Sequence, residues 1–103
     1  MPHVIVSTTT ATEQEAASLA RSLVDAKLAG CVHIQPVRSV YRWKAEILDE
    51  PEWHLAIKTT AQRYKAVEAH IREHHSYETP EIVCIAIVRG SPEYLGWLDE
   101  NVG

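Results

Sequence analysis

The side chains most able to do chemistry gather in one stretch, "HHSYETPEI", which runs from His74 to Ile82. Its histidines, tyrosine and glutamates could supply either metal ligands or an acid–base pair. His70 lies one helical turn before His74, so both imidazoles would share a helix face and could approach one ion. Imidazole suits Cu²⁺, Zn²⁺ and Ni²⁺. Alternatively, both are solvated residues at a helix C-terminus, where the helix dipole favours a protonated histidine.

Cys31 is a further candidate metal ligand, because it begins a predicted strand on which His33 shares its face. A thiolate beside an imidazole favours Cu⁺ or Zn²⁺. The alternative is a buried small hydrophobic residue, the usual fate of a free cysteine. For Cys84, within the apolar run "IVCIAIV", the buried interpretation is favoured. The two cysteines form no CxxC motif, so we expect reduced thiols and no disulfide framework.

A third set combines aromatic rings, one amine and two carboxylates, and could line a cleft for a small anionic or amphipathic ligand. Its members are Tyr41, Trp43, Lys58, Tyr77, Glu78 and Glu81. Tyr41 and Trp43 could instead anchor a protein interface, where aromatic side chains dominate the binding energy. Glu78 and Glu81 near His74 could form an acid–base set, but no phosphate-binding loop, GxSxG motif or recognisable Cys–His dyad accompanies them. We therefore do not expect an enzyme.

Length and charge limit the classes of protein that this chain can belong to. A chain of 103 residues with 46% hydrophobic content fits one domain, residues 1–103, with its own core. The net charge is −4 and the ten basic residues are scattered, which argues against nucleic acid or an anionic membrane surface as the main partner. No apolar run is long enough to span a bilayer, and the N-terminus lacks a signal-peptide pattern. We expect a soluble, intracellular protein.

The patterning predicts the order β-α-β-β-α-β with a short terminal helix. A strand, "HVIVSTTT", precedes a helix that begins at a capping box, Thr12 and Glu15, runs to about residue 28 and is stopped by Gly30. Thr60 starts a second helix that ends near His74, and "IVCIAIV" is a strand buried on both faces. Ser91 and Pro92 begin the last helix. This order is that of the ferredoxin-like α+β fold, with an antiparallel sheet.

Residues 31–60 form a long hairpin in this interpretation. The apolar positions change parity after Pro36, which predicts a bulge or kink, and "LDEPE" predicts the turn. A strand from residue 31 to 47 would extend roughly 50 Å, whereas a domain of about 100 residues has a radius of gyration near 13 Å. The hairpin therefore overhangs its own domain and carries Tyr41 and Trp43 outward. Together with the apolar last strand at a sheet edge, this predicts an obligate homo-oligomer.

Five segments resemble the signature blocks of the CutA family of divalent-cation tolerance proteins, in the family's order and across nearly the whole chain. They are "AGCVHI", "SVYRWKAEI", "LAIKT", "HHSYETPEI" and "YLGWL". The resemblance implies a trimer of ferredoxin-like subunits similar to the PII signalling proteins, a cytoplasmic setting, and a role in tolerance to copper and other divalent metals. The sequence departs from the family at Ser76 and Ala45, where proline and glycine are common, and at Cys84, where an aliphatic residue is usual.

Three functions remain open from the sequence. The first is a metal-responsive protein that binds copper or another divalent cation weakly through Cys31, His70 and His74. The second is a PII-like module that holds a small ligand in a cleft between subunits. The third is an interaction scaffold without a ligand.

Overall fold

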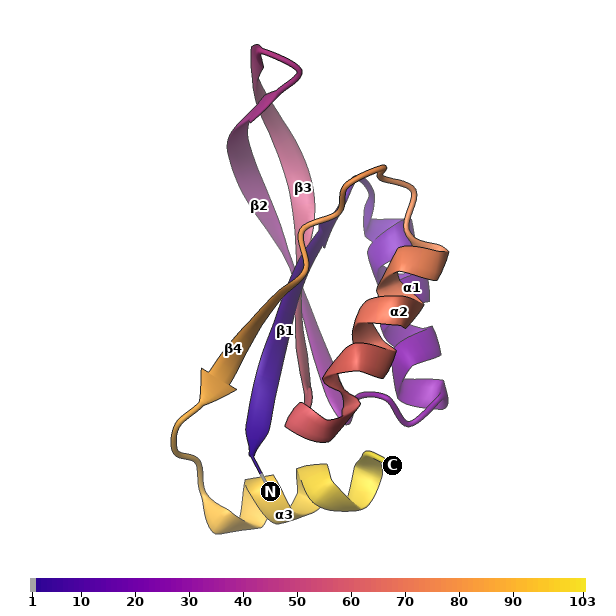
Figure 1. Ribbon diagram of the computed structural model, residues 1–103, viewed down its shortest axis with the longest axis vertical. Helices are drawn as coiled ribbons and strands as arrows, with labels where there is room; N and C mark the ends of the chain where they lie inside the picture. The colour runs from indigo at the N-terminus through magenta and orange to yellow at the C-terminus, as the bar shows by residue number, and fades with distance from the viewer. Residues whose placement is uncertain (1) are drawn as a thin grey trace.

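The computed structural model describes residues 2–103, and in this range the chain folds into one four-stranded antiparallel sheet and three α-helices (Figure 1). The elements are β1 (His3–Thr10), α1 (Glu13–Asp25), β2 (Cys31–Trp43), β3 (Glu46–Thr60), a 3₁₀ turn η1 (Ala61–Arg63), α2 (Tyr64–His74), β4 (Val83–Ile87) and α3 (Pro92–Asn101). The strand order β2-β3-β1-β4 is that of the ferredoxin-like fold. The predicted fold class is confirmed.

Helices α1 and α2 cover one face of the sheet (Figure 1). Side chains on a strand alternate between faces, so one parity of each strand enters the core. Val4 and Val6 of β1 and Leu55 and Ile57 of β3 point to the helices and are almost fully buried. The residues that meet them from the helices are Ala16, Leu19, Ala20, Leu23, Val67 and Ile71.

The predicted starts of the first and last helices are correct, whereas the start predicted at Thr60 is wrong: Thr60 ends β3, the 3₁₀ turn η1 follows, and α2 begins at Tyr64. The Thr12 side chain accepts a hydrogen bond from the Glu15 backbone N–H, and the Ser91 hydroxyl accepts one from the Tyr94 N–H. The predicted end of α1 is wrong, because the helix stops at Asp25 and the chain turns at Lys27, whose φ is 59°. A left-handed residue ends the helix regardless of which side chain occupies it, and the glycine was not needed for this purpose.

Gly30 instead permits the close approach of α3. A Cβ atom at Gly30 would lie 2.6 Å from Leu98 Cδ1, and the Leu98 side chain is fully buried. A second contact joins the ends of the chain, since His3 Nε2 lies 2.8 Å from Asp99 Oδ1. Both contacts hold α3 against the end of the sheet where β1 starts (Figure 1).

The β2–β3 hairpin covers the predicted residues but is more regular than the sequence predicts. Its turn is Lys44–Ala45, with φ values of 50° and 69°, so the expected turn at "LDEPE" is wrong and β3 runs straight through Pro51. Pairing from Cys31 opposite Lys58 to Trp43 opposite Glu46 is unbroken, so no bulge interrupts the strand at Pro36. Half of the backbone N–H groups of an edge strand point to solvent and not to the neighbouring strand. At such a position a proline, which has no N–H, removes no hydrogen bond from the ladder and leaves the register intact.

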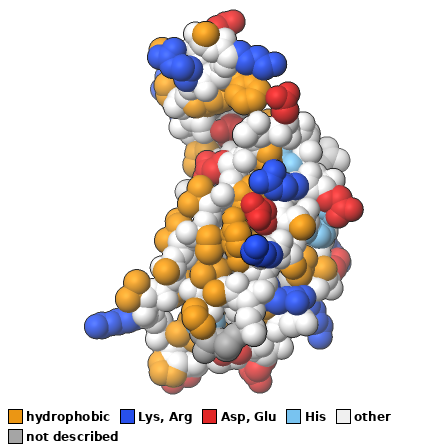
Figure 2. Space-filling model, in the orientation of Figure 1, with side chains coloured by type: hydrophobic (Ala, Val, Ile, Leu, Met, Phe, Trp, Pro, Cys, Tyr) orange, Lys and Arg blue, Asp and Glu red, His pale blue; other side chains and the backbone are white. Residues whose placement is uncertain are grey.

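The hairpin projects beyond the rest of the sheet, as predicted, and gives the molecule a longest dimension of 44 Å (Figure 1). Strand β4 lies at the opposite edge, but it is not buried on both faces: Ile85 is 51% exposed. The continuous apolar pattern of β4 reflects a surface that the helices of this chain leave uncovered. Figure 2 shows hydrophobic side chains gathered over β4 and the adjoining part of the sheet. None of the helices in residues 2–103 has the length and apolar character to cross a membrane.

Candidate functional site

The segment between α2 and β4 is held in place by the buried imidazole of His75. Its Nε2 lies 2.7 Å from the Thr9 carbonyl oxygen and its Nδ1 accepts the Tyr77 backbone N–H at 3.0 Å. Nε2 must therefore carry the proton that is donated to Thr9. Nearby, the Glu15 carboxylate accepts from the backbone N–H and the hydroxyl of Ser76. The Glu15 carboxylate therefore binds Ser76. Of the two hydrogen bonds of the predicted capping box, the one from the Glu15 backbone N–H to the Thr12 side chain is formed.

A groove of about 760 Å³ opens between this corner and the hairpin. It is lined by Thr9, Ser39, Val40, Tyr41, Trp43, Glu52, Ser76, Tyr77, Glu78, Thr79, Pro80 and Glu81. Five of the six predicted cleft residues, all except Lys58, lie around it. A single chain supplies both walls, although the sequence predicts that two subunits share the cleft. That these residues bind a ligand stays a prediction.

Glu52 is the buried charge of this groove, with only 6% of the residue exposed. Its Oε2 accepts a 2.6 Å hydrogen bond from the Tyr77 hydroxyl. Burial and this hydrogen bond to Glu52 raise the pKa of Tyr77, so the phenol remains a donor. Within residues 2–103, the other carboxylate oxygen, Oε1, forms no hydrogen bond or ion pair, and it is not one of the fully buried unpartnered atoms, so it keeps contact with solvent at the groove.

The hairpin wall is fixed by its own cross-strand pairs. The Tyr41 hydroxyl donates a 2.7 Å hydrogen bond to Glu50, and this bond raises the pKa of Tyr41 to about 12. Arg38 forms a two-pronged ion pair with Asp49 on the same hairpin, at 2.8 and 2.7 Å. The Arg38 guanidinium is therefore paired with Asp49 and not with Glu52.

Lys58 lies at the opposite end of the sheet, in a cluster with the predicted metal ligand Cys31. Cys31 Sγ lies 3.7 Å from His33 Nε2, and Lys58 Nζ lies 3.3 Å from His33 Nδ1. The amine also lies 5.6 Å from the centre of the Tyr94 ring. Burial raises the pKa of Tyr94, and the neighbouring Cys31 raises it further. The structure therefore groups Cys31 with His33 and an amine, on a face of the sheet that α2 does not cover.

His70 and His74 share a helix face, as the spacing predicts, and their rings stack with centroids 4.1 Å apart. His70 Nε2 lies 2.8 Å from the Ser22 hydroxyl, and His74 Nδ1 lies 2.8 Å from the His70 carbonyl oxygen. Burial lowers the pKa of His70, and the neighbouring His74 lowers it further. No cluster of three or more His, Cys, Asp or Glu side chains suited to a metal ion occurs in residues 2–103. Metal binding by these histidines stays a prediction.

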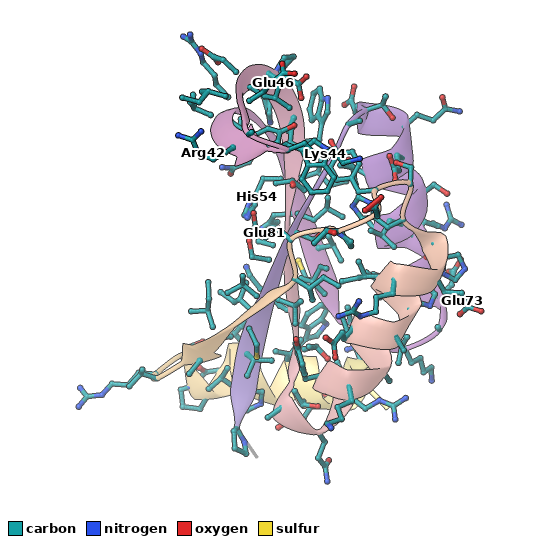
Figure 3. The ribbon with its side chains drawn as sticks, turned by 45° about the horizontal axis from the view of Figure 1, so that its top comes forward. Arg42, Lys44, Glu46, His54, Glu73 and Glu81 are labelled. Carbon is teal, nitrogen blue, oxygen red and sulfur yellow. The ribbon has the colours of Figure 1, made fainter. Side chains whose placement is uncertain are left out.

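Sequence reasoning missed two parts of the groove region. One is Glu52, which was assigned to a turn although Glu50, Glu52 and His54 alternate as strand residues do. The other is Ser7, whose hydroxyl lies 2.7 Å from His54 Nε2 and donates to Glu81 at 3.0 Å. Figure 3 shows His54 and Glu81 close together beside β1. The signal was available for Glu52 but not for Ser7, whose partners lie 47 and 74 positions away.

Known proteins resemble the chain over nearly all its length. The family model described as "CutA1 divalent ion tolerance protein" matches residues 4–101. The divalent-cation tolerance protein CutA of Thermus thermophilus is 39% identical over 100 residues, which are 96% of this chain and 97% of that protein. The structure of the periplasmic divalent cation tolerance protein CutA from Archaeoglobus fulgidus superposes with a TM-score of 0.96 at 36% identity, covering 98% of this chain and 99% of the other. CutA1 from Oryza sativa superposes with a TM-score of 0.97 at 33% identity, covering 100% and 95% of the two chains.

Proposed function

The chain belongs to the CutA1 divalent ion tolerance family, and from this membership we propose that it is a cytoplasmic homotrimer that binds copper or a similar divalent cation weakly. The observation that supports the metal proposal best is the pair formed by Cys31 Sγ and His33 Nε2, 3.7 Å apart. A thiolate and an imidazole are the donors that copper and zinc prefer. Two such donors are half of a tetrahedral set, so the binding is weak.

His70 and His74 are the second part of the metal proposal. In the present arrangement His70 Nε2 is engaged by Ser22 and His74 Nδ1 by a backbone carbonyl. The other nitrogen of each ring, His70 Nδ1 and His74 Nε2, is left for a cation, and a rotation of the stacked rings would be needed to bring both to one ion. This requirement also makes a weak site.

Isothermal titration calorimetry of metal-free protein with Cu²⁺ and with Zn²⁺ tests both parts. We expect binding to the parent, weaker binding to the Cys31→Ser variant, and a smaller loss in the His70→Ala/His74→Ala double variant. If all three proteins bind alike, the ligand assignment is wrong. A Cys84→Ser variant serves as the matched control, because Cys84 lies on β4, a different element from those that carry His33, His70 and His74, and its side chain is exposed and not buried as the sequence predicts.

The trimer proposal is supported by surfaces that this chain leaves uncovered. The sheet face opposite the helices exposes Val83 and Ile85, and the hairpin exposes Trp43, which is 38% accessible. Apolar surface of this kind marks an interaction site. Sedimentation equilibrium should give three times the 11.6 kDa subunit mass at micromolar concentration. A monomer mass would refute the proposal.

The cytoplasmic setting is a separate part of the proposal. It depends on the setting that the resemblance to the CutA family implies, although a relative from Archaeoglobus fulgidus is described as periplasmic. Fractionation of cells that express the full chain, followed by immunoblotting against marker proteins, should place it in the cytosolic fraction. Its appearance in an extracytoplasmic fraction would overturn this part only.

A second candidate function is a PII-like module that binds a small ligand. The groove of about 760 Å³ favours it, since small-molecule sites are concave and combine apolar walls with a few polar groups. Titration of candidate small molecules against metal-free protein tests this candidate. If none binds and no metal binds either, the remaining reading is an interaction scaffold without a ligand.

A further inference from the structure

We propose that the groove between the hairpin and the α2–β4 corner binds a small organic ammonium cation, with Glu52 as its counter-charge. This inference rests on the second candidate function, the small-ligand module, and is independent of the metal proposal. Of the two ligands that the sequence suggests, anionic or amphipathic, it replaces the anionic one, because a cleft without Lys58 has no lining amine to bind an anion. Lys58 lies instead beside His33 and Tyr94.

The charged side chains that line the groove are all acidic. Its lining includes three carboxylates, Glu52, Glu78 and Glu81, and, within the described residues 2–103, no Lys, Arg or His. Arg38 does not line the groove, because the pairing of Val37 with Glu52 puts it on the other face of the hairpin, where its guanidinium forms two hydrogen bonds with Asp49. An anion entering the groove would meet like charges, whereas a cation would meet opposite ones. The three lining carboxylates outnumber the Lys44 amine, which lies near Trp43 at the hairpin end of the groove, so the net field favours a cation.

Glu52 carries the argument further, because a buried carboxylate is costly unless it is paired. Only 6% of the residue is exposed, yet no cationic side chain of residues 2–103 forms an ion pair with it. The Tyr77 hydroxyl satisfies Oε2, and Oε1 remains without a partner in the described chain. Because Oε1 keeps contact with solvent at the groove, an ammonium N–H could reach it, replace water there and supply a positive charge that no side chain of residues 2–103 provides to Glu52.

The remaining walls suit the carbon part of such a cation. Tyr41, Trp43 and Tyr77 supply aromatic surface, and the face of an aromatic ring attracts a positively charged group. Trp43 already has an ammonium near it, since Lys44 Nζ lies 5.6 Å from the ring centre. With no cluster of metal-ligating side chains in residues 2–103, the groove does not offer a site for a bare metal ion. An alkylammonium ion uses both the aromatic and the acidic walls.

Calorimetric titration of the metal-free parent protein with butylammonium chloride and, separately, with sodium butyrate tests the sign of the charge. The two probes share a four-carbon chain and differ in charge. We expect butylammonium to bind with a dissociation constant of about 1 mM or lower and butyrate to give no binding heat. If butyrate binds and butylammonium does not, the ammonium inference is wrong while the small-ligand module survives. If neither binds, both are wrong.

Charge-neutralising variants locate the site. Glu52→Gln keeps an acceptor for the Tyr77 hydroxyl and should weaken butylammonium binding about tenfold or more. Glu78→Gln, at an exposed position in the lining, folds without difficulty and should weaken binding several-fold. Glu73→Gln is the matched control. The Glu73 side chain is exposed on α2, far from the hairpin end that carries Lys44 (Figure 3). This variant should bind butylammonium as the parent does. Equal losses in Glu73→Gln and Glu52→Gln would refute a specific site.

A structure of the assembled protein tests the competing occupant. If a Lys or Arg of a neighbouring copy donates to Glu52 Oε1, that copy supplies the cation and the ammonium proposal is wrong. If the groove remains open to solvent in the assembly, the proposal stands with the calorimetry.

Discussion

The Tyr77 hydroxyl donates a 2.6 Å hydrogen bond to Glu52 Oε2, and this contact joins two walls that lie 25 positions apart in the sequence. Tyr77 belongs to the connection between α2 and β4, whereas Glu52 lies on β3 in the hairpin. The bond fixes the width of the groove at its buried end. It also makes the groove a property of one folded chain.

Removing this bond should destabilise the protein. Tyr77→Phe leaves the buried Glu52 carboxylate without its donor, and hydrogen bonds to charged groups contribute about 1.5–3 kcal/mol. We expect the free energy of unfolding in urea to fall by about 2 kcal/mol. Tyr64→Phe is the control, since no hydrogen bond involves the Tyr64 hydroxyl among the described residues, and it should change stability by less than about 0.5 kcal/mol. Equal losses in both variants would contradict the assigned role.

The tyrosines should make stability depend on alkaline pH. All four have a raised pKa in the folded chain, that of Tyr41 to about 12 through its hydrogen bond to Glu50. A raised pKa means that the unfolded chain loses its phenolic protons first, near pH 10. The stabilisation is therefore complete below about pH 10 and is lost as the pH rises through the folded values. Chemical unfolding from neutral to alkaline pH, with tyrosinate absorbance as a second readout, should show this loss, and a Tyr41→Phe/Tyr77→Phe variant should show less of it.

The hairpin turn offers a stabilising substitution. Lys44 and Ala45 both have positive φ, as a type I′ turn requires, and Ala45 has a Cβ that disfavours this conformation. Ala45→Gly should raise the free energy of unfolding by about 0.5–1 kcal/mol. Ala69→Gly, at an exposed position inside α2, should lower it by about 1 kcal/mol. A destabilised Ala45→Gly variant would show that the turn does not limit stability.

The docking of α3 should depend on the missing side chain at Gly30. Gly30→Ala places a Cβ atom 2.6 Å from Leu98 Cδ1 in a packed contact, and overpacking costs about 1–3 kcal/mol. Combining it with Leu98→Val makes room for the new methyl group, so the double variant should lose less than the two single losses added together. Thermal unfolding of the four proteins measures this coupling. Additive losses would mean that the two residues do not interact.

Trp43 should contribute to assembly if the hairpin lies in the trimer interface. Trp43→Ala removes an aromatic anchor, and such hot-spot changes cost about 2 kcal/mol or more of association energy. Analytical ultracentrifugation over a dilution series should show dissociation at higher protein concentration than for the parent. Val24→Ala is the control, because Val24 is exposed on α1, and it should leave the assembly unchanged. An unchanged dissociation constant for Trp43→Ala would place the hairpin outside the interface.

Much of the fold was predictable because local patterns and core burial agree. The helix starts at Thr12 and Ser91 depend on side chains within three residues of the cap, and the structure forms both bonds. The period-2 pattern of β3 put Leu55 and Ile57 on the core face, where they are fully buried. Errors arose where a local signal competed with pairing. Pro36 and Pro51 suggested a bulge and a turn, but the register of the long hairpin continues through both positions.

The candidate site was predictable only in part, for a related reason. The sequence predicts Tyr77, Glu78 and Glu81 as site residues because they lie close together in one stretch rich in histidine, tyrosine and glutamate. It could not show that Lys58 points to the opposite end of the sheet, beside His33. Nor could it show that Glu52 is buried, since a glutamate in "LDEPE" has the composition of an exposed turn. Both facts depend on strand register, which sets the face and the end of the sheet that a side chain reaches.

The sequence by itself determined the order of the elements, the family and the apolar character of the last strand, because these follow from periodicity, caps and motif spacing along the chain. Only the tertiary structure decided the charge of the groove. Glu52 and Tyr77 meet through a contact between distant segments. Lys58 lies outside the groove because its pairing with Ile5 of β1 places it nearer the other end of the sheet. Long-range pairing brings these groups together or separates them, and no pattern within a few residues records that outcome.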